Sequence, residues 1–569
     1  MSTAKTVLAL LLCSLSAQPQ SRQCGPPAYR CSRTDQAVTQ ADAAPKLDFG
    51  GSTGANTTLT DSAYNNVAIT RCTDARTNPE NPNASYYVGL GGSSGKNIWN
   101  TDDTLLLFGD TGGELFLMRF DPRAKRCSPV LAASAQLFQV QAGVFSKTEA
   151  RTYYDFAWPK SFQVSPIMIP TRGAPTVGPP IVDFTPALYQ SSVPVWPGAG
   201  QSVALGAVIK PANNNPSGWL FQAITTGLTN GVAEPLWGST VLPSQSGKHR
   251  VHDGTVTWEN VGNSTSSLPY VDVGGVEDRD RYIAESVSFD GAQDTGGWAL
   301  VYDRQQNVIY QYNTWSGIET DFSYSEGAWI STVVGKATSD RLIWHENQLG
   351  FDGLHYVLDI AVCDSCRQTT PVEVWEPGKA VVSEMYPFSE GHLVSGSSHI
   401  VNQDGENDYF AIRSMAKLGQ YSALWMPAPC TNTNQSKPPY PHPPCFPVFD
   451  THLSWNYNAG EDQEPLIGTA ISGSPTAEAV SPWEYELIGI PTCGAAPRSP
   501  CPPGYPQGVI WRFGRTFNFK VRGGFYDSIA SGAVSQTGRY YSLTSVGNGT
   551  MGRSPSGQAR SDVLVYQLQ

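Results

Sequence analysis

The stretch 97–122, "NIWNTDDTLLLFGDTGGELFLMRFDP", decides the fold. Two apolar runs, LLLF and LFLM, flank a turn rich in Asp and Gly, which predicts a β-hairpin. The same order of strand, turn and strand recurs at 285–313, "ESVSFDGAQDTGGWALVYDRQQNVIYQYN", and at 341–360, "RLIWHENQLGFDGLHYVLDI". No amphipathic helical pattern extends beyond about three turns. The sequence therefore predicts an all-β protein.

Similar units recur along the chain with a diverged sequence and a period of roughly 40 to 50 residues, which is typical of a β-propeller. They lie at 154–171, 392–415, 452–473 and 529–551. Counting the units predicts seven blades, with six or eight as alternatives and a β-sandwich array or a β-helix as the structural rival. The final "RSDVLVYQL" (560–568) reads as a strand that closes the ring against an early strand such as "NNVAITRC" (65–72).

The composition agrees with a protein rich in strands and turns. Charged residues make up 15% of the chain and aromatic residues 11%, with 55 glycines and 43 prolines. The formal net charge of -12 argues against nucleic acid as a partner. It also argues against a polyanionic substrate unless the fold assembles a basic patch locally. Neutral glycans, proteins and small molecules are the partners that this charge favours.

The first seventeen residues, "MSTAKTVLALLLCSLSA", have the pattern of a secretory signal peptide: a lysine, an apolar run and small residues. The apolar run is too short to cross a bilayer, and no later segment is long and apolar enough to do so. The mature protein is expected to be secreted, either extracellular or periplasmic, and residues 18–60 are expected to form a flexible segment stapled by a disulfide.

Removal of the signal peptide leaves ten cysteines, an even number that favours disulfides in an exported protein. Most occur in close pairs within loops rich in Pro and Gly, which suggests local staples, and Cys72 with Cys127 is the one long-range pair. The pair Cys363 and Cys366 has neither a redox nor a zinc context. The ten are Cys24, Cys31, Cys72, Cys127, Cys363, Cys366, Cys430, Cys445, Cys493 and Cys501.

The region 189–262 breaks the period of the blades and separates the blades of 61–188 from those of 263–569. Its "WLFQA" (219–223), "EPLW" (234–237) and "DGTVTW" (253–258) resemble a small β-module of phage tail proteins and exported bacterial proteins, related in pattern to chitin-binding modules. In such modules exposed aromatic side chains stack on sugar rings, so the resemblance implies ligand binding by Trp196, Trp219, Trp237 and Trp258. The alternative reading places Trp237 and Trp258 in the core of a very small domain.

Outside this insert, the chain resembles uncharacterised exported bacterial β-propellers that are distantly similar to TolB-like propellers. The matching pieces are "NIWNTDDTLLLF", "SVSFDG", "THLSWNY", "SPWEYELIGI" and the segment that runs from "GAVSQTGRYYSL" to the end. The resemblance covers most of the chain outside the insert. It implies the fold and export, and no particular activity.

Three histidines, His345, His392 and His452, lie on the predicted first strands of three successive blades. First strands line the channel of a propeller, so the imidazoles are candidates to hold a divalent transition metal, with Glu346 or Glu390 as a further ligand. Oligogalacturonate lyases have a similar set of channel histidines, but too few residues match to carry that activity over. The alternative is that each histidine bonds a backbone carbonyl of the next blade and fixes packing.

Glu484 and Glu486 alternate along a predicted strand, so their carboxylates share one face about 7 Å apart, near the separation of inverting glycoside hydrolases. This pair is a weak catalytic candidate, because carboxylates on one face of a strand are common. No phosphate loop, dinucleotide fingerprint, serine nucleophile elbow or haem motif occurs in the sequence.

The leading functional hypothesis is an exported propeller that binds a neutral carbohydrate or another cell-surface polymer through its funnel face and its insert. A metal-assisted polysaccharide lyase or hydrolase that uses the channel histidines is the first alternative, and an extracellular interaction scaffold is the second. No sequence feature demands catalysis, and the oligomeric state is left open.

Overall fold

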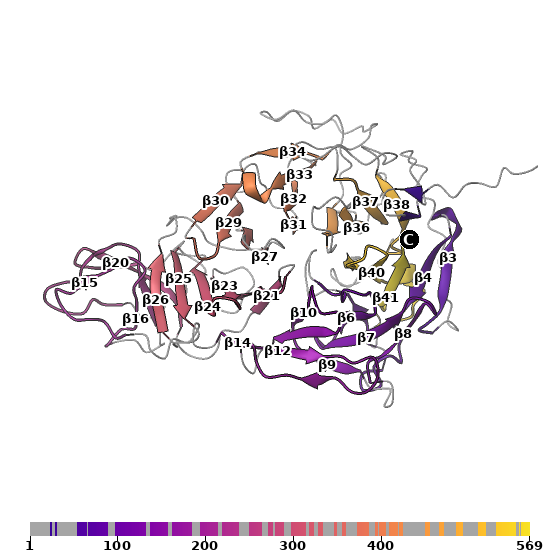
Figure 1. Cartoon of the computed structure of the whole chain (residues 1–569), viewed down its shortest axis with the longest axis horizontal. Coiled ribbons are helices and arrows are strands. Elements are labelled where there is room, and N and C mark those ends of the chain that lie inside the picture. The colour runs from indigo at the N-terminus through magenta and orange to yellow at the C-terminus, as the bar shows by residue number, and fades with distance from the viewer. Residues whose placement is uncertain are drawn as a thin grey trace, which may run out of the picture.

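The computed structural model describes residues 23–24, 29–30 and 54–568 (Figure 1). Within the last span it leaves out 65, 83, 89–96, 132–136, 157–161, 185–193, 214–218, 238–249, 264–270, 277–278, 289–296, 314–317, 324–327, 334–345, 350–355, 360–371, 380, 386–392, 397, 405–408, 419, 425–449, 456–465, 472–484, 493–509, 519–530, 554–556 and 558. The described residues form strands and three short 3-10 turns, η1 (Ser62–Tyr64), η3 (Met415–Lys417) and η4 (Gly547–Gly549).

The predicted hairpin at 97–122 is confirmed and belongs to the first sheet of the ring. β6 (Leu105–Asp110) pairs with β7 (Leu115–Asp121) across the predicted turn, with Phe108 opposite Phe116. Every residue of β6 is buried, because neighbouring sheets cover both of its faces. This explains why the strand reads as a continuous apolar run and not as an alternating pattern. The sheet is completed by β5 (Tyr86–Tyr87), β8 (Arg126–Pro129) and β9 (Phe138–Val140).

The following sheets are antiparallel and follow one another along the chain. The second comprises β10 (Gly143–Phe145), β11 (Thr152–Phe156), β12 (Gln163–Met168), β13 (Thr176–Val177) and β14 (Val182–Asp183). The third comprises β21 (Val271–Val276), β22 (Tyr282–Ser288), β23 (Gly297–Asp303), β24 (Val308–Asn313), β25 (Ile318–Ser323) and β26 (Ala328–Val333). β22, β23 and β24 are the three strands predicted for 285–313.

Three four-stranded sheets come next. They comprise β27 (Glu346–Leu349), β28 (Tyr356–Asp359), β29 (Val372–Glu376) and β30 (Val381–Met385); β31 (Leu393–Ser395), β32 (His399–Asp404), β33 (Tyr409–Ser414) and β34 (Tyr421–Ala423); and β35 (Asp450–Ser454), β36 (Leu466–Ile471), β37 (Glu486–Ile490) and β38 (Trp511–Arg515). A separate pair near the N-terminus, β1 (Gln23–Cys24) and β2 (Tyr29–Arg30), stands outside these sheets.

The last sheet joins the two ends of the chain. Its strand order is β3 (Thr58–Asp61), β4 (Val67–Arg71), β41 (Asp562–Gln567), β40 (Tyr540–Ser545) and β39 (Gly532–Val534). β4 pairs with β41, which places Ile69 opposite Tyr566 as the sequence predicts for these two segments. An early strand thus completes the sheet of the latest ones.

Contacts between first strands arrange the sheets in a ring (Figure 1). β10 lies against β21, β21 against β27, β27 against β31, β31 against β35, and β35 against β39. The last sheet contacts β5, and the first sheet meets the second where the Phe145 N–H donates to the Asn97 carbonyl at 3.1 Å. The chain is therefore an all-β propeller. Seven blades for the chain as a whole stays a prediction.

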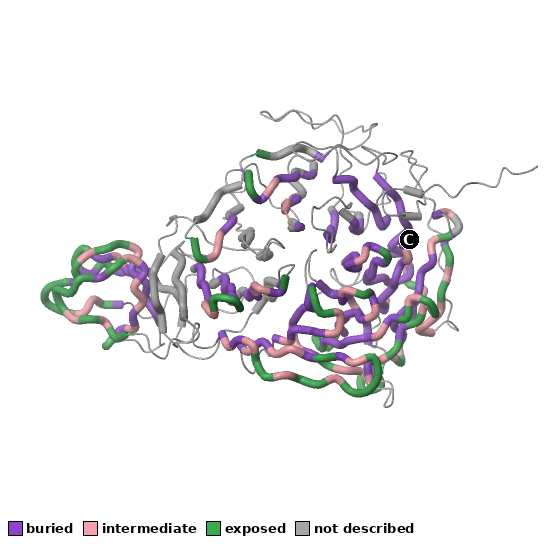
Figure 2. Tube along the Cα trace, in the orientation of Figure 1, coloured by how far each residue is buried: buried purple, intermediate pink, exposed green. Residues whose placement is uncertain are grey.

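Hydrophobic residues fill the spaces between sheets, so the core is distributed around the ring (Figure 2). One cluster joins the last sheet to the first two, where Trp99 stacks on Tyr540 with ring centroids 6.2 Å apart. At Gly143 and Gly532, the first residues of β10 and β39, an added Cβ would lie 2.1 Å from a backbone oxygen of the next strand. Glycine is required at both positions by this close approach.

A small β unit projects from the ring between the second and third sheets (Figure 1). It contains β15 (Ser202–Val203) paired with β18 (Gly227–Leu228). Its second sheet has the order β16 (Val208–Ile209), β17 (Trp219–Ala223), β20 (Val256–Asn263) and β19 (Arg250–Asp253). The buried residues of its core all come from 203–258, so the unit has a hydrophobic core of its own.

Candidate functional site

The channel histidines are the first candidate site, and the structure describes one of the three. His452 is on β35, a first strand between β31 and β39, and is 7% exposed. His345 and His392 lie outside the described residues, as does the Glu390 side chain; of Glu346 only the backbone, at the start of β27, is described. In the described part of the chain, no three His, Cys, Asp or Glu side chains are grouped as metal ligands. The proposed metal site stays a prediction.

Glu486, a weak catalytic candidate of the sequence, is described by the structure, and its catalytic role stays a prediction. Glu486 is 6% exposed, and its Oε2 accepts a hydrogen bond from Arg512 Nε at 2.6 Å. Its Oε1 accepts from Tyr64 Oη at 2.6 Å and also from Arg512 Nη2. The buried ion pair with Arg512 thus links β37 to β38, and the hydrogen bond from Tyr64 links β37 to η1. Glu484 lies outside the described residues.

The tryptophans of the projecting unit differ in how far they are buried. Trp237 and Trp258 are 2% and 0% exposed and meet edge to face, with ring centroids 6.0 Å apart. They form the unit's core and present no ring to a sugar, which agrees with the alternative reading of the sequence. Trp196 is half-buried, and its indole Nε1 donates to Asp253 Oδ2 at 2.8 Å. The Trp219 side chain lies outside the described residues, so its role stays a prediction.

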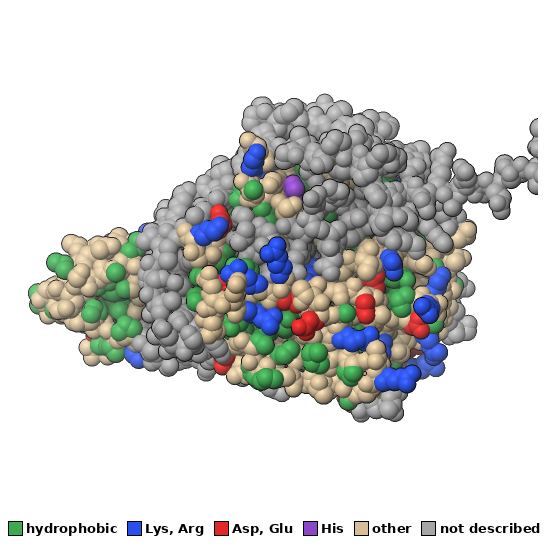
Figure 3. Space-filling view, in the orientation of Figure 1, with side chains coloured by type: hydrophobic (Ala, Val, Ile, Leu, Met, Phe, Trp, Pro, Cys, Tyr) green, Lys and Arg blue, Asp and Glu red, His purple; other side chains and the backbone are tan. Residues whose placement is uncertain are grey.

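In its described residues the unit exposes large apolar side chains. Leu228, Val232 and Leu236 are 53%, 88% and 84% exposed. Figure 3 shows hydrophobic side chains on the projecting unit with few charged ones between them. The segment 227–237 that bears these side chains is held by Glu234, whose carboxylate accepts from the Ala212 N–H at 2.6 Å and from the Trp237 indole at 2.8 Å. We call residues 227–237 the outer segment.

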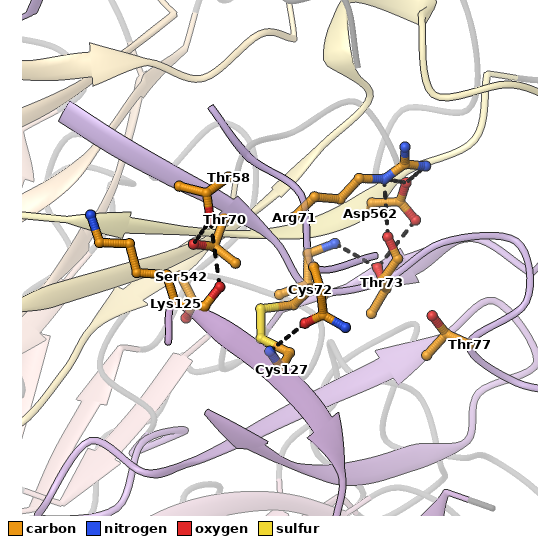
Figure 4. The surroundings of a disulfide bond; sticks show 12 residues. Thr58, Thr70, Arg71, Cys72, Thr73, Thr77, Lys125, Cys127, Ser542 and Asp562 are labelled. Carbon is orange, nitrogen blue, oxygen red and sulfur yellow. Dashed lines mark hydrogen bonds and ion pairs between the residues drawn. A yellow bond between two sulfur atoms is a disulfide. The ribbon is translucent and has the colours of Figure 1, made fainter. Parts of the chain in front are cut away.

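The long-range disulfide predicted from the sequence is confirmed. Cys72 follows β4 and Cys127 lies on β8, with Cα atoms 5.2 Å apart (Figure 4). The bond joins the last sheet of the ring to the first. Of the other predicted cysteines, Cys24 lies on β1 and its side chain is not described, and the remaining seven lie outside the described residues.

Buried acidic groups connect the turns of neighbouring sheets, which sequence reasoning missed. Asp103 and Asp280 have left-handed backbones, with φ of 58° and 56°. Asp103 accepts from the Thr537 hydroxyl and N–H of the last sheet, and Asp280 accepts from Lys147 N at 2.9 Å and Thr148 Oγ1 at 2.6 Å. The signal is visible in hindsight: "SQT" (535–537) and "SKT" (146–148) occupy equivalent turns.

Burial also changes the acidity of several carboxyl groups in the ring. It raises the pKa of Asp103 to about 6, although hydrogen bonds from Thr537 oppose the shift. It raises the pKa of Asp155 on β11 to about 6, against one hydrogen bond from the Gln141 N–H. Burial, with the negative charge of Asp183, holds the pKa of Glu285 on β22 well above its usual range. These groups lie between sheets, so their titration bears on the stability of the ring.

Comparisons with known proteins identify no family for the chain. No protein-family model and no curated protein matches it, so the two resemblances drawn from the sequence stay predictions. Among solved structures, an oligogalacturonate lyase in complex with manganese aligns over 90% of this chain and 96% of its own, at 9% identity and a TM-score of 0.35. The Cps50 (Swd1) β-propeller domain of Myceliophteria thermophila covers 68% and 96% at 8% identity and a TM-score of 0.27. Both similarities are too low to support a conclusion about activity.

No helix in the described residues is long and apolar enough to cross a membrane.

Proposed function

We propose that the protein is an exported polymer-binding propeller, and that its projecting unit binds a neutral polysaccharide. The observation that carries the proposal is the outer segment, which exposes the three large aliphatic side chains of Leu228, Val232 and Leu236. Of the six large apolar side chains that are well exposed in the described residues, four lie in this unit: Val195, Leu228, Val232 and Leu236. Such a concentration is typical of a binding surface.

A neutral ligand fits this surface for an electrostatic reason. The acidic side chains of the unit are already paired inside it: Glu259 accepts from Arg250 Nε at 2.8 Å, and Asp253 accepts from two indoles. Glu234 of the outer segment is held in the same way by the Ala212 N–H and the Trp237 indole, and an uncharged ligand brings no further charge that contact would remove from water. The axial C–H faces of pyranose rings are apolar and suit the exposed aliphatic groups.

Binding to insoluble chitin and cellulose tests this proposal. We expect the protein to sediment with at least one of the two polymers, and a Val232→Asp/Leu236→Asp variant to bind at least about tenfold more weakly, because a carboxylate would be desolvated in the contact. Val177→Asp is the matched control, because Val177 is 66% exposed on β13 of the ring. Equal binding by the two variants, or no binding by the wild-type protein, would rule the proposal out.

The alternative, a metal-assisted polysaccharide lyase or hydrolase, rests on the position of His452 on a first strand beside β31. His345 and His392 directly precede β27 and β31 in the sequence, and both lie outside the described residues. This alternative stays a prediction, and so does the interaction scaffold.

A further inference from the structure

One end of the ring sheets carries a row of exposed cations. In an antiparallel sheet the turn after the first strand and the turn after the third lie at the same end. The turns after first strands contact one another between neighbouring sheets, through Asp103 with Thr537 and through Asp280 with Lys147. Arg304, in the turn after the third strand β23, lies at the same end, because its side chain donates to the Asp280 carbonyl at 2.9 Å. The turns after β7, β12, β23, β29 and β33 therefore share one face of the ring.

The five turns contain six basic residues and no acidic one. They read PRAK (122–125), IPTRGAP (169–175), RQQN (304–307), PGKA (377–380) and MAKLGQ (415–420). We call their basic residues the cationic rim: Arg123, Lys125, Arg172, Arg304, Lys379 and Lys417. All are exposed except Lys125, which is half-buried. Figure 3 shows Lys and Arg side chains distributed over the described part of the ring, with Asp and Glu side chains among them.

Most of the rim is available to a ligand. Within the described residues, the side chains of Arg123, Arg172 and Lys417 make no hydrogen bond or ion pair. Lys379 pairs with Glu376 at 2.7 Å, but its side chain is still 54% exposed. Such a solvated pair contributes little energy and can be exchanged for a ligand carboxylate.

The excess of basic residues in these five turns contrasts with the chain as a whole, which has a formal net charge of -12. The connections between second and third strands belong to the opposite ends of the sheets. Three of them, TGGE (111–114), FDGAQDTG (289–296) and GEND (405–408), contain no Lys or Arg, whereas 157–162, 360–371 and 546–561 contain Lys160, Arg367, Arg553 and Arg560. The turns after third strands are therefore basic in all five sheets, while the turns after first strands at the same end include the acidic Asp102 and Glu149, and the opposite ends carry charges of both signs. Separated charges of this kind create a local potential that net charge conceals.

We propose that the cationic rim binds an acidic polysaccharide, a chain of uronate residues, on the face of the ring that carries the turns. The cations follow one another from sheet to sheet, as the carboxylates follow one another along a polyuronate, and Arg can hold a carboxylate in a bidentate pair. The five turns contain no aromatic residue, which argues against single-stranded nucleic acid, because its bases stack on such side chains. This surface is separate from the outer segment.

Retention on immobilised polygalacturonate tests the proposal with the full-length protein. We expect binding at low ionic strength that is lost as salt screens the charges, and no binding to the methyl-esterified polymer. An Arg172→Glu/Lys417→Glu variant should bind about tenfold more weakly, because two attractive contacts become repulsive. Arg76→Glu/Arg553→Glu changes the charge equally at the opposite ends of the sheets and should bind like the wild-type protein.

The outcomes separate this inference from the proposed function. Loss of polygalacturonate binding in the rim variant, with chitin or cellulose binding unchanged, supports a second surface. Equal losses in the rim and control variants would mean that the overall charge is responsible and would overturn the proposal. So would an absence of binding, or tighter binding to single-stranded DNA or to vesicles of anionic phospholipid than to polygalacturonate.

Discussion

Carboxyl groups between the sheets favour their protonated form, and Asp155 is the simplest case. It is partly buried on β11, and its Oδ1 accepts one hydrogen bond, from the Gln141 N–H at 2.7 Å. Burial raises its pKa to about 6 from an unfolded value near 4. Between these values the folded protein binds more protons than the unfolded chain. The contribution of Asp155 to stability is therefore complete below about pH 4 and is lost as the pH rises through 6.

Asp155→Asn should accordingly stabilise the protein at high pH. The amide oxygen can accept the same hydrogen bond, and no charge is left to desolvate. We expect the free energy of unfolding at pH 8 to rise by about 1–2 kcal/mol relative to the wild-type protein, after allowance for partial exposure, with little difference at pH 4. Urea denaturation at the two pH values measures the change. If the variant were destabilised equally at pH 4 and pH 8, burial would not destabilise the charged form of Asp155, and the expectation would be wrong.

At the scale of elements, the disulfide holds together the two sheets at which the ring closes. Cys72 leaves β4 where Arg71 donates to Asp562 Oδ2 at 2.6 Å, and Cys127 N–H donates to Asn56 Oδ1 at 2.6 Å (Figure 4). Both sulfur-bearing residues are buried. The bond closes a loop of 55 residues, so it restricts the unfolded chain substantially.

Replacing both residues, Cys72→Ala/Cys127→Ala, should lower the free energy of unfolding by about 2–4 kcal/mol while leaving the fold intact. Alanine fits the buried site without adding a polar group that lacks a partner. Chemical denaturation monitored by circular dichroism gives the change. An unfolding midpoint equal to that of the wild-type protein would mean that the hydrogen bonds between β4 and β41 hold the closure without the disulfide.

Elements were predictable from the sequence where the signal is local. The apolar runs of β6 and β7 and the glycines between them specify a hairpin without reference to the rest of the chain, and the apolar pattern of 560–568 specifies β41. The contact of Glu486 with Tyr64 was not predictable from the sequence, because the two residues are 422 positions apart. Trp237 and Trp258 remained ambiguous because an aromatic side chain suits both a core and a sugar surface, and only the packing of β17 and β20 decides between them.

At the scale of the whole molecule, the projecting unit and the ring have separate cores. The unit begins at Val195, which pairs with Lys210 beside β16, and it ends with β20. β16 pairs with β17, and β17 pairs with β20, so three strand spacings separate the two ends, a distance of about 15 Å. A flexible Gly-Ser linker of about eight residues spans that distance.

Replacing residues 195–262 by such a linker should therefore leave the ring folded. We expect the melting temperature of the ring to change by no more than a few degrees and polygalacturonate binding to remain, while binding to neutral polysaccharide is lost. Differential scanning calorimetry and the two binding assays check these outcomes together. Collapse of the ring in the deletion variant would show that the unit supports the sheets beside it.

The pairing of β4 with β41 also sets an order of events for a chain made from one end. Arg71 and Asp562 are 491 residues apart, so the ribosome completes almost the entire protein before β4 can meet its partner. Until then β3 and β4 are a hairpin with an exposed edge, which can pair with another chain. The early strand β4 therefore depends on the last residues of the chain for its partner. A chain interrupted before residue 562 would contain most of its sheets, but its ring would be open and accessible to proteases.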